Sequence, residues 1–192
     1  MTQPAKRILV YGSLEFGRVV EDLAIQCGYE FAGFIDDLNT GAKILGGWET
    51  VCRTHAVSGH ALAIAVGYRH MQERRALWMR ARAQGYAMPA LIHPRAYVRD
   101  PASIGSGAFI MAGAIVDVGA SVGEFAVVWP GATINHDSSV GANTFVSPNA
   151  AVCGKTTVGE NCFIGAGAVI VDHQSVPAGS FIKAGSVHAS AD

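Results

Sequence analysis

A histidine followed directly by an aspartate, His136-Asp137, is the pair of residues in this sequence best suited to acid–base chemistry. An imidazole with an ordinary pKa near ~6.5 can take up a proton at neutral pH, and an adjacent carboxylate can hold its tautomer and raise its basicity. A solvated turn would accommodate the same two residues. The choice between a catalytic base and a turn therefore depends on the elements that position the pair.

A second group of residues has the pattern of a nucleotide-binding turn. Gly12 and Gly17 bound a glycine-x4-glycine segment, and such turns let backbone N–H groups and a helix N-terminus approach phosphate oxygens. Asp36 and Asp37 follow the next β-rich run, about where an acidic residue meets the ribose or base in a nucleotide-binding βαβ unit. Purely structural turns would use the same residues, so this assignment also needs context.

The first 91 residues alternate β-rich runs with charged, helix-like stretches. We expect helices over residues 15–27 and 70–84. The β-rich runs predict strands over residues 7–11, 29–35, 61–66 and 88–92. This order predicts a small α/β domain of the βαβ, Rossmann-like type over residues 1–91.

From Ile92 onward the sequence follows a six-residue repeat. Every sixth residue is aliphatic from Ile92 to Ile182, and the residue four places after each aliphatic one is small, except Gln174. Neither a helix with a period of 3.6 nor a strand with a period of 2 places one buried aliphatic residue at every sixth position. A solenoid does, because each aliphatic side chain stacks on its equivalents in neighbouring coils. We therefore expect a β-solenoid over residues 92–187 and a short tail over residues 188–192.

With this repeat, the sequence resembles the hexapeptide-repeat acyltransferases, whose left-handed parallel β-helix has three hexads in each triangular coil. A βαβ domain fused to such a solenoid that carries Asn135-His136-Asp137 resembles the sialic-acid-associated and bacillosamine-pathway (NeuD/PglD-like) sugar N-acetyltransferases over almost the whole chain. The resemblance implies an acyltransferase that uses acetyl-CoA to acetylate the amino group of a nucleotide-linked amino sugar in surface glycan biosynthesis.

The resemblance also implies roles for individual residues. His136 would be the general base that removes a proton from the sugar amine as it attacks the thioester, and Asp137 would increase its basicity. The residues expected near the nucleotide-linked sugar are Gly12, Ser13, Asp36, Asp37 and Gly67. Those expected along the CoA arm are Gly154, Ala166 and Ala184.

Several positions depart from the family pattern. Phe145 stands where many members have a second histidine, and Trp129 replaces a common asparagine. Glu15 and Phe16 replace a glycine-histidine pair in the phosphate turn, where a carboxylate would repel a diphosphate unless it points away. The closing Gly-Asn-Pro-Ala-like segment of many members does not follow Val187. A changed sugar or a changed acyl group is therefore compatible with the sequence.

Composition excludes several classes of partner. With 14 basic and 15 acidic residues the formal net charge is −1, which gives no support for binding nucleic acid or an anionic membrane surface. Only 15% of the residues are charged and 50% are hydrophobic, so part of the surface is expected to be buried in an oligomer, and the resemblance implies a homotrimer. The longest largely apolar stretch, residues 101–116, is too short for a membrane-spanning helix.

The cysteines and histidines indicate a cytoplasmic protein without a metal. Four cysteines without CxxC spacing are expected to be reduced thiols. The other histidines do not complete a ligand set with His136 at a recognisable spacing, so no metal is expected. Two alternative functions stay open: a sugar O-acetyltransferase of the sialic-acid type, and a non-catalytic protein that binds a nucleotide sugar or CoA.

Overall fold

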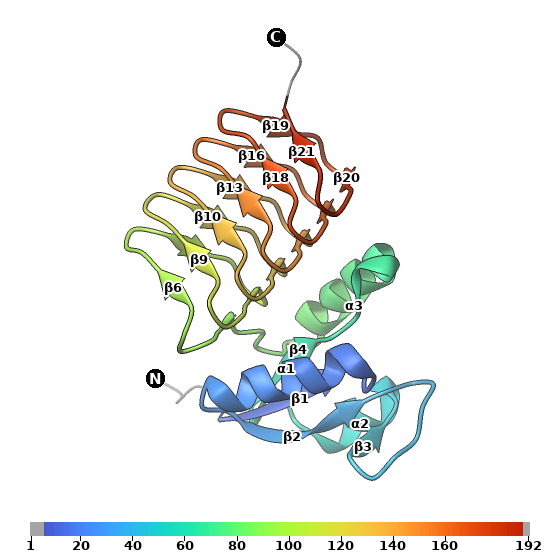
Figure 1. Cartoon of the computed structure of the whole chain (residues 1–192). Coiled ribbons are helices and arrows are strands. Elements are labelled where there is room, and N and C mark those ends of the chain that lie inside the picture. Colours follow the sequence, from blue (N-terminus) through green and yellow to red (C-terminus); the bar gives the residue numbers. More distant parts are fainter. Residues whose placement is uncertain (1–5, 190–192) are drawn as a thin grey trace. The chain divides into compact units, whose positions relative to one another are not determined.

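The structure is a computed structural model that describes residues 6–189. The chain forms two compact units, with the boundary between Pro89 and Ala90 (Figure 1). Residues 190–192 of the expected tail lie outside the described residues, and Val187–His188 form the last strand. No helix within residues 6–189 is long and apolar enough to cross a membrane.

The first unit contains a four-stranded sheet in which every neighbouring pair is parallel. Its strands are β1 (Arg7–Tyr11), β2 (Glu30–Ile35), β3 (Ile44–Gly46) and β4 (His60–Ile64), in the order β3-β2-β1-β4. Ile8, Leu9 and Val10 of β1 are fully buried. A continuous apolar run is typical of a parallel strand that is covered on both faces.

Three α-helices and one 3-10 turn accompany this sheet: α1 (Glu15–Gln26), α2 (Trp48–Thr54), η1 (Tyr68–His70) and α3 (Met71–Gln84). Helix α1 buries Val20, Leu23 and Ala24, which share one face because they are three and four residues apart. Helix α3 ends at Gly85, whose positive φ of 90° is a conformation that glycine adopts without strain.

Two sequence predictions for this part of the chain need correction. The interval between residues 36 and 60 contains β3 and α2, neither of which was predicted, because the glycines of this interval obscure any period. The expected strand over residues 88–92 is shortened to Leu91–Ile92, which pairs within the second unit, while Ala87 forms only an isolated bridge with Ala61.

The second unit is a β-solenoid of two-residue strands, each paired in parallel with the strand eighteen residues further on. The strands form three sheets, so each coil contributes one strand to each sheet. The first sheet holds β5 (Leu91–Ile92), β8 (Phe109–Ile110), β11 (Val127–Val128), β14 (Phe145–Val146), β17 (Phe163–Ile164) and β20 (Phe181–Ile182). The second holds β6 (Tyr97–Val98), β9 (Ile115–Val116), β12 (Thr133–Ile134), β15 (Ala151–Val152), β18 (Val169–Ile170) and β21 (Val187–His188). The third holds β7 (Ser103–Ile104), β10 (Ser121–Val122), β13 (Ser139–Val140), β16 (Thr157–Val158) and β19 (Ser175–Val176).

The interior of the solenoid is built from the two repeating positions of each hexad. Aliphatic residues such as Val128, Ile134 and Val152 are fully buried, together with small residues such as Ala126 and Ala132. The stacked coils therefore share one continuous apolar core, as the repeat predicted.

The turns at the corners have a fixed backbone conformation. From Gly107 to Gly185, the third residue of every turn has a positive φ. Most of these residues are glycine, asparagine or aspartate, which tolerate this conformation. Asp137 is one of them, with φ 56°, so the residue beside His136 is part of a repeated turn geometry.

Candidate active site

The imidazole of His136 and the carboxylate of Asp137 lie together on the turn that follows β12. His136 Nδ1 and Asp137 Oδ2 are 3.2 Å apart, and both side chains are about half exposed. Three backbone hydrogen bonds hold this turn in place: Asn135 N–H donates to Val152 O, Asp137 N–H to Val118 O, and Lys155 N–H to His136 O. The coils before and after thus fix the backbone from which both side chains project.

Gly154 lies directly against the imidazole, one coil further along the solenoid. A Cβ at Gly154 would lie 2.5 Å from His136 Nε2, closer than real Cβ atoms come to other heavy atoms. On the side of the preceding coil, a Cβ at Gly119 would lie 2.6 Å from Asp137 Oδ1. Glycines in both neighbouring coils therefore leave space for the histidine and the aspartate.

The other two residues expected along the CoA arm lie elsewhere on the coil. Ala166 follows β17 and Ala184 follows β20, so both are on turns that leave the first sheet, whereas His136 and Gly154 are on turns that leave the second sheet. Within one chain, Ala166 and Ala184 therefore occupy a different corner from His136. Both alanines are exposed.

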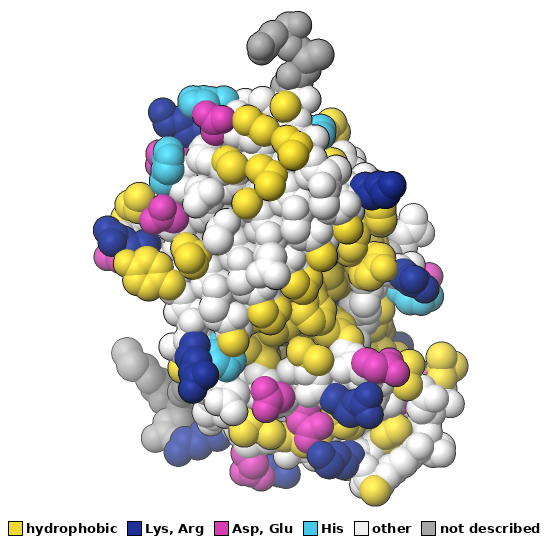
Figure 2. Space-filling view, in the orientation of Figure 1, with side chains coloured by type: hydrophobic (Ala, Val, Ile, Leu, Met, Phe, Trp, Pro, Cys, Tyr) yellow, Lys and Arg dark blue, Asp and Glu magenta, His cyan; other side chains and the backbone are white. Residues whose placement is uncertain are grey.

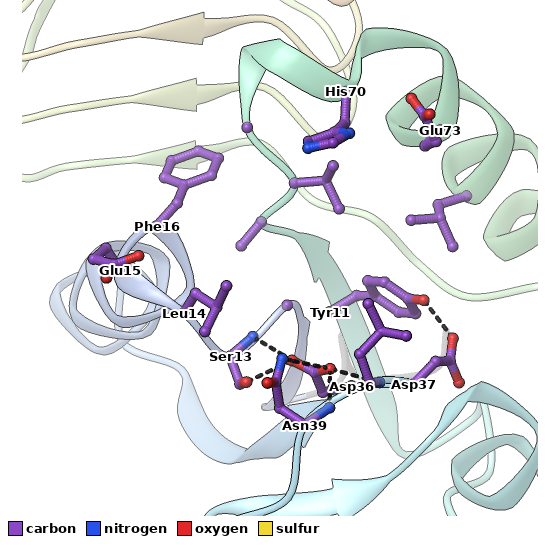
Figure 3. A pocket seen from close by; sticks show the side chains of 16 residues that line it. Tyr11, Ser13, Leu14, Glu15, Phe16, Asp36, Asp37, Asn39, His70 and Glu73 are labelled. Carbon is purple, nitrogen blue, oxygen red and sulfur yellow. Dashed lines mark hydrogen bonds between the residues drawn. The ribbon is translucent and has the colours of Figure 1, made fainter.

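A separate cavity of about 430 Å³ lies within the first unit, where β1, β2 and β4 end (Figure 3). The carboxyl ends of parallel strands are where open α/β sheets bind ligands. The expected residues Gly12, Ser13, Asp36, Asp37 and Gly67 all line this cavity. Sequence reasoning therefore identified residues that the fold does bring together.

Gly12 and Gly17 are required by the close approach of the backbone. Gly12 has φ 99°, and a Cβ at Gly17 would lie 2.1 Å from Gly12 O. The glycine-x4-glycine pattern is thus explained by packing between strand and helix. Gly67, in contrast, has no atom within 4 Å of its added Cβ, so it borders open space in the cavity.

The carboxylate of Asp36 accepts hydrogen bonds from several neighbouring loop residues. It accepts hydrogen bonds from Ser13 Oγ at 2.5 Å, from Leu38 N–H and Asn39 N–H at 2.9 Å each, and from the Asn39 side chain. Burial raises the pKa of Asp36, but these hydrogen bonds outweigh burial and hold the pKa well below its ordinary value. Asp36 is therefore an ionised group that organises the edge of the cavity.

The carboxylate of Asp37 is more accessible to a ligand than that of Asp36. It is exposed, and it accepts one hydrogen bond from Tyr11 Oη at 2.5 Å and one from Trp48 N–H at 2.7 Å. Burial, and then the hydrogen bond to Asp37, raise the pKa of Tyr11, so this phenol stays a donor at neutral pH. Each carboxylate oxygen of Asp37 keeps a further lone pair, which can accept a hydrogen bond from a ligand.

Sequence reasoning missed several residues that line the cavity. Leu14 and Leu38 are 62% and 92% exposed, and both border it. His70 and Glu73 line it from η1 and the first turn of α3 (Figure 3). The exposure of these two leucines depends on the loop conformation that Asp36 stabilises, and no spacing in the sequence predicts it. Glu15, noted as a departure, also lines the cavity.

Two other departures have a clear place in the fold. Phe145 of β14 is 1% exposed, so the side chain that replaces the second histidine is buried. Trp129 is half-buried on the turn after β11. Within residues 6–189, no group of three or more histidine, cysteine, aspartate or glutamate side chains could hold a metal ion.

Comparison with known families matches both units. The family described as "PglD N-terminal domain" matches residues 7–79, and the family "bacterial transferase hexapeptide (six repeats)" matches residues 137–172. Among curated protein sequences, none matches significantly. The acetyltransferase domain of PglB from Neisseria gonorrhoeae is 31% identical in sequence, with a TM-score of 0.89 over 96% of this chain and 91% of that chain. The chain belongs to the NeuD/PglD-like sugar N-acetyltransferases.

Two further NeuD/PglD-like structures carry ligands. The same gonococcal domain in complex with acetyl-CoA is 31% identical, with a TM-score of 0.89 and coverage of 95% and 90%. A histidine-to-alanine mutant of GDP-perosamine N-acetyl transferase from Caulobacter crescentus, in complex with CoA and GDP-perosamine, is 27% identical. Its TM-score is 0.89 and the coverage is 95% of this chain and 88% of that chain.

Membership of the NeuD/PglD-like family confirms three predictions from the sequence. The family is the one that the Asn-His-Asp hexad and the fused βαβ domain indicated. The solenoid is the left-handed β-helix of hexapeptide repeats. The protein is an acyltransferase.

Proposed function

We propose that this NeuD/PglD-like protein transfers the acetyl group of acetyl-CoA to the amino group of a nucleotide-linked amino sugar, with His136 as the general base. The observation that carries the proposal is the arrangement of the imidazole. Asp137 lies beside Nδ1, and Nε2 lies against Gly154. If Asp137 accepts the Nδ1 proton, Nε2 holds a lone pair on the side where a substrate can approach.

The chemistry follows from that lone pair. The sugar amine attacks the thioester carbonyl, a C–N bond forms, and Nε2 of His136 takes the proton that the nitrogen loses. The C–S bond then breaks, and the CoA thiolate leaves and receives the proton from the imidazolium. Much of the rate would come from holding the amine against the thioester. The backbone of Gly154 is close enough to Nε2 to contact the same reacting atoms, and its N–H would stabilise the oxyanion.

The cavity of the first unit is the proposed site for the nucleotide part of the substrate. Asp37 and Ser13 offer polar groups there, while Leu14 and Leu38 offer apolar surface to a base. The Caulobacter relative binds GDP-perosamine, which supports a nucleotide-linked sugar as the substrate class. Glu15, Asp37 and Glu73 line the cavity, and among its lining residues His70 is the one that could carry a positive charge. A diphosphate would be repelled by these carboxylates, so we place the base and ribose inside the cavity.

CoA is the proposed cosubstrate, and a homotrimer is the proposed assembly. The gonococcal relative was solved with acetyl-CoA and the Caulobacter relative with CoA. Gly154 lies on one corner of the coil, whereas Ala166 and Ala184 lie on another. A CoA arm that contacts all three would therefore run between two neighbouring solenoids, each of which supplies one corner.

The experiment that tests the proposal is release of the CoA thiol from acetyl-CoA by the purified wild type and by His136→Ala. The acceptors are UDP-, GDP- and dTDP-linked amino sugars, each compared with the same sugar nucleotide carrying a hydroxyl in place of the amine. We expect release that depends on one nucleotide and on the amine, and a loss of about 10²-fold or more in His136→Ala.

Other outcomes would redirect the proposal. Equal release with the hydroxyl-bearing acceptor would indicate O-acetylation. Full activity in His136→Ala would show that another group removes the proton. Calorimetry that detects binding of the nucleotide sugar and CoA by both proteins, without any thiol release, would point to a binding protein.

A further inference from the structure

The turn that carries His136 has a hydroxyl where the preceding coils have a methyl group. Ser138 occupies the small inward position of this turn, and Ala120 and Ala102 occupy the same position one and two coils earlier. The Ser138 side chain is 1% exposed. A buried hydroxyl needs hydrogen-bond partners, so its contacts indicate what it does.

Ser138 bonds both ends of the turn that carries Gly154. Its Oγ donates to Cys153 O at 2.7 Å and accepts from Thr156 N–H at 3.1 Å. These are the first and fourth residues of the turn 153–156. The same hydroxyl lies 3.4 Å from His136 O, so it links the backbone of the histidine turn to the backbone of the glycine turn.

This arrangement differs from that of most turns in the solenoid. In those turns the fourth residue donates directly to the first, as Ala120 N–H does to Asp117 O and Ala132 N–H to Trp129 O, both at 3.1 Å. In the turn 153–156, the Ser138 hydroxyl stands between the two groups that would otherwise bond each other. The turn around Gly154 is therefore held open by a side chain from the His136 turn.

The position of this turn matters because the Gly154 backbone packs closely against the imidazole. A Cβ at Gly154 would lie only 2.5 Å from His136 Nε2, so a shift of a few tenths of an ångström changes how the ring packs. We propose that Ser138 is a positioning residue, whose hydroxyl sets the separation between the His136 imidazole and the Gly154 backbone. Its catalytic consequence rests on the proposed function of His136.

Thr144 provides a matched control on another corner. Thr144 Oγ1 donates to Gly159 O at 2.9 Å and accepts from Cys162 N–H at 3.0 Å, the same pattern as Ser138 one hexad later. Its side chain is fully buried too. Thr144→Ala therefore removes an equivalent pair of hydrogen bonds without altering the turns of His136 or Gly154.

The first test follows His136 itself and needs no substrate. In protein with isotope-labelled histidine rings, the His136 resonance is identified by its loss in His136→Ala and is then followed in Ser138→Ala, Ser138→Thr and Thr144→Ala. We expect Ser138→Ala to shift this resonance, and the other two variants to leave it in place. A His136 resonance that coincides in wild type, Ser138→Ala and Thr144→Ala would overturn the inference.

The second test measures kcat and KM of the same variants in the thiol-release assay. We expect Ser138→Ala to lower kcat about tenfold, while Ser138→Thr and Thr144→Ala stay within about twofold of wild type. Equal losses in Ser138→Ala and Thr144→Ala would reduce Ser138 to a structural role. Activity that survives in His136→Ala would contradict the proposed function of His136 and leave the resonance test of Ser138 valid.

Discussion

At the scale of single residues, Gly154 has no room for a side chain beside His136. Gly154→Ala would bring a methyl group to within 2.5 Å of Nε2, so the ring would have to rotate away from its present position. Other coils carry Val118 and Asp172 at this position, so a side chain is compatible with the coil itself. We expect kcat to fall by about 10- to 100-fold at nearly unchanged thermal stability.

The control for this prediction is Gly59→Ala, because a Cβ there would meet only Ala56 O, at 3.8 Å. Steady-state kinetics and thermal unfolding of both variants provide the comparison. Wild-type kcat in Gly154→Ala would show that the imidazole adjusts without loss and that its contact with Gly154 is not needed for catalysis.

Asp36 allows a prediction about the first unit. Asp36→Ala would leave Ser13, Leu38 N–H and Asn39 N–H without their acceptor, at a cost of about 1–3 kcal/mol in the free energy of unfolding. We also expect weaker binding of the nucleotide sugar, because Leu38 and Asn39 line the cavity. Urea unfolding and calorimetry test both effects, with the exposed Asp22→Ala as the control. Binding at wild-type strength in Asp36→Ala would show that the loop is not held by this carboxylate.

The role of Asp36 also shows which residue properties a sequence can and cannot supply. His136 and Asp137 were found because an unusual hexad interrupts a regular repeat. Asp36 and Asp37 are adjacent identical residues, and only the folded loop makes one a saturated acceptor and the other an exposed one. Hydrogen-bond partners that are distant in the chain are set by the tertiary structure, so spacing could not separate the two.

At the scale of elements, the end of α2 and the start of β4 bring two histidines together. The rings of His55 and His60 are 5.2 Å apart, and Thr54 Oγ1 lies 2.8 Å from His55 Nδ1. Burial lowers the pKa of His55, and the nearby charges of His60 and Arg7 lower it further. The folded chain therefore binds a proton at His55 less readily than the unfolded chain does.

Stability should consequently fall as the solution becomes more acidic. The unfolded state takes up the His55 proton at a higher pH than the folded state, so the contribution is present above the unfolded value of 6.5 and is lost below it. We expect the midpoint of urea unfolding to decrease between pH 7.5 and pH 5.5, and His55→Gln to reduce this decrease. His188→Gln, in the last strand of the solenoid, should leave it unchanged. A decrease in His55→Gln as large as that of wild type would rule out this origin.

The two units differ in how far their elements could be predicted. The solenoid repeats one hexad, so each aliphatic position is supported by its equivalents in every other coil, and all strands from β6 to β20 end on these residues. The short β3 and α2 have no such support, since α2 covers seven residues and β3 only three. Strand β3 forms by pairing with β2, and α2 packs against β3, and local propensity does not reveal either contact.

At the scale of the whole molecule, the surface of the solenoid is compatible with close packing of identical chains. The outward residues of the second sheet carry no charge, and Figure 2 shows few charged side chains away from the edges of the solenoid. These outward residues are Tyr97, Ile115, Thr133, Ala151, Val169 and Val187. A face without charges can be buried between subunits at little electrostatic cost, which agrees with the proposed trimer.

The proposed trimer allows a test of whether each active site is formed between two chains or within a single chain. His136→Ala removes the proposed base on one corner. Ala184→Trp places a bulky side chain on the other corner, at an exposed position where the chain can still fold. Each variant alone should be inactive. If every active site combines His136 of one chain with Ala184 of its neighbour, random assembly of equal amounts leaves about a quarter of the sites with both intact residues.

Co-refolded or co-expressed mixtures of the two variants should therefore recover about a quarter of wild-type thiol release, whereas the same proteins mixed after assembly should stay inactive. Size-exclusion chromatography with light scattering establishes that the mixture has the mass of three chains. Recovery requires that a base and an acyl-CoA corner come from different chains, since no single chain in the mixture carries both. Co-assembled trimers without recovery would place His136 and Ala184 of the same chain in one site, and the CoA arm would then have to cross a face of its own solenoid.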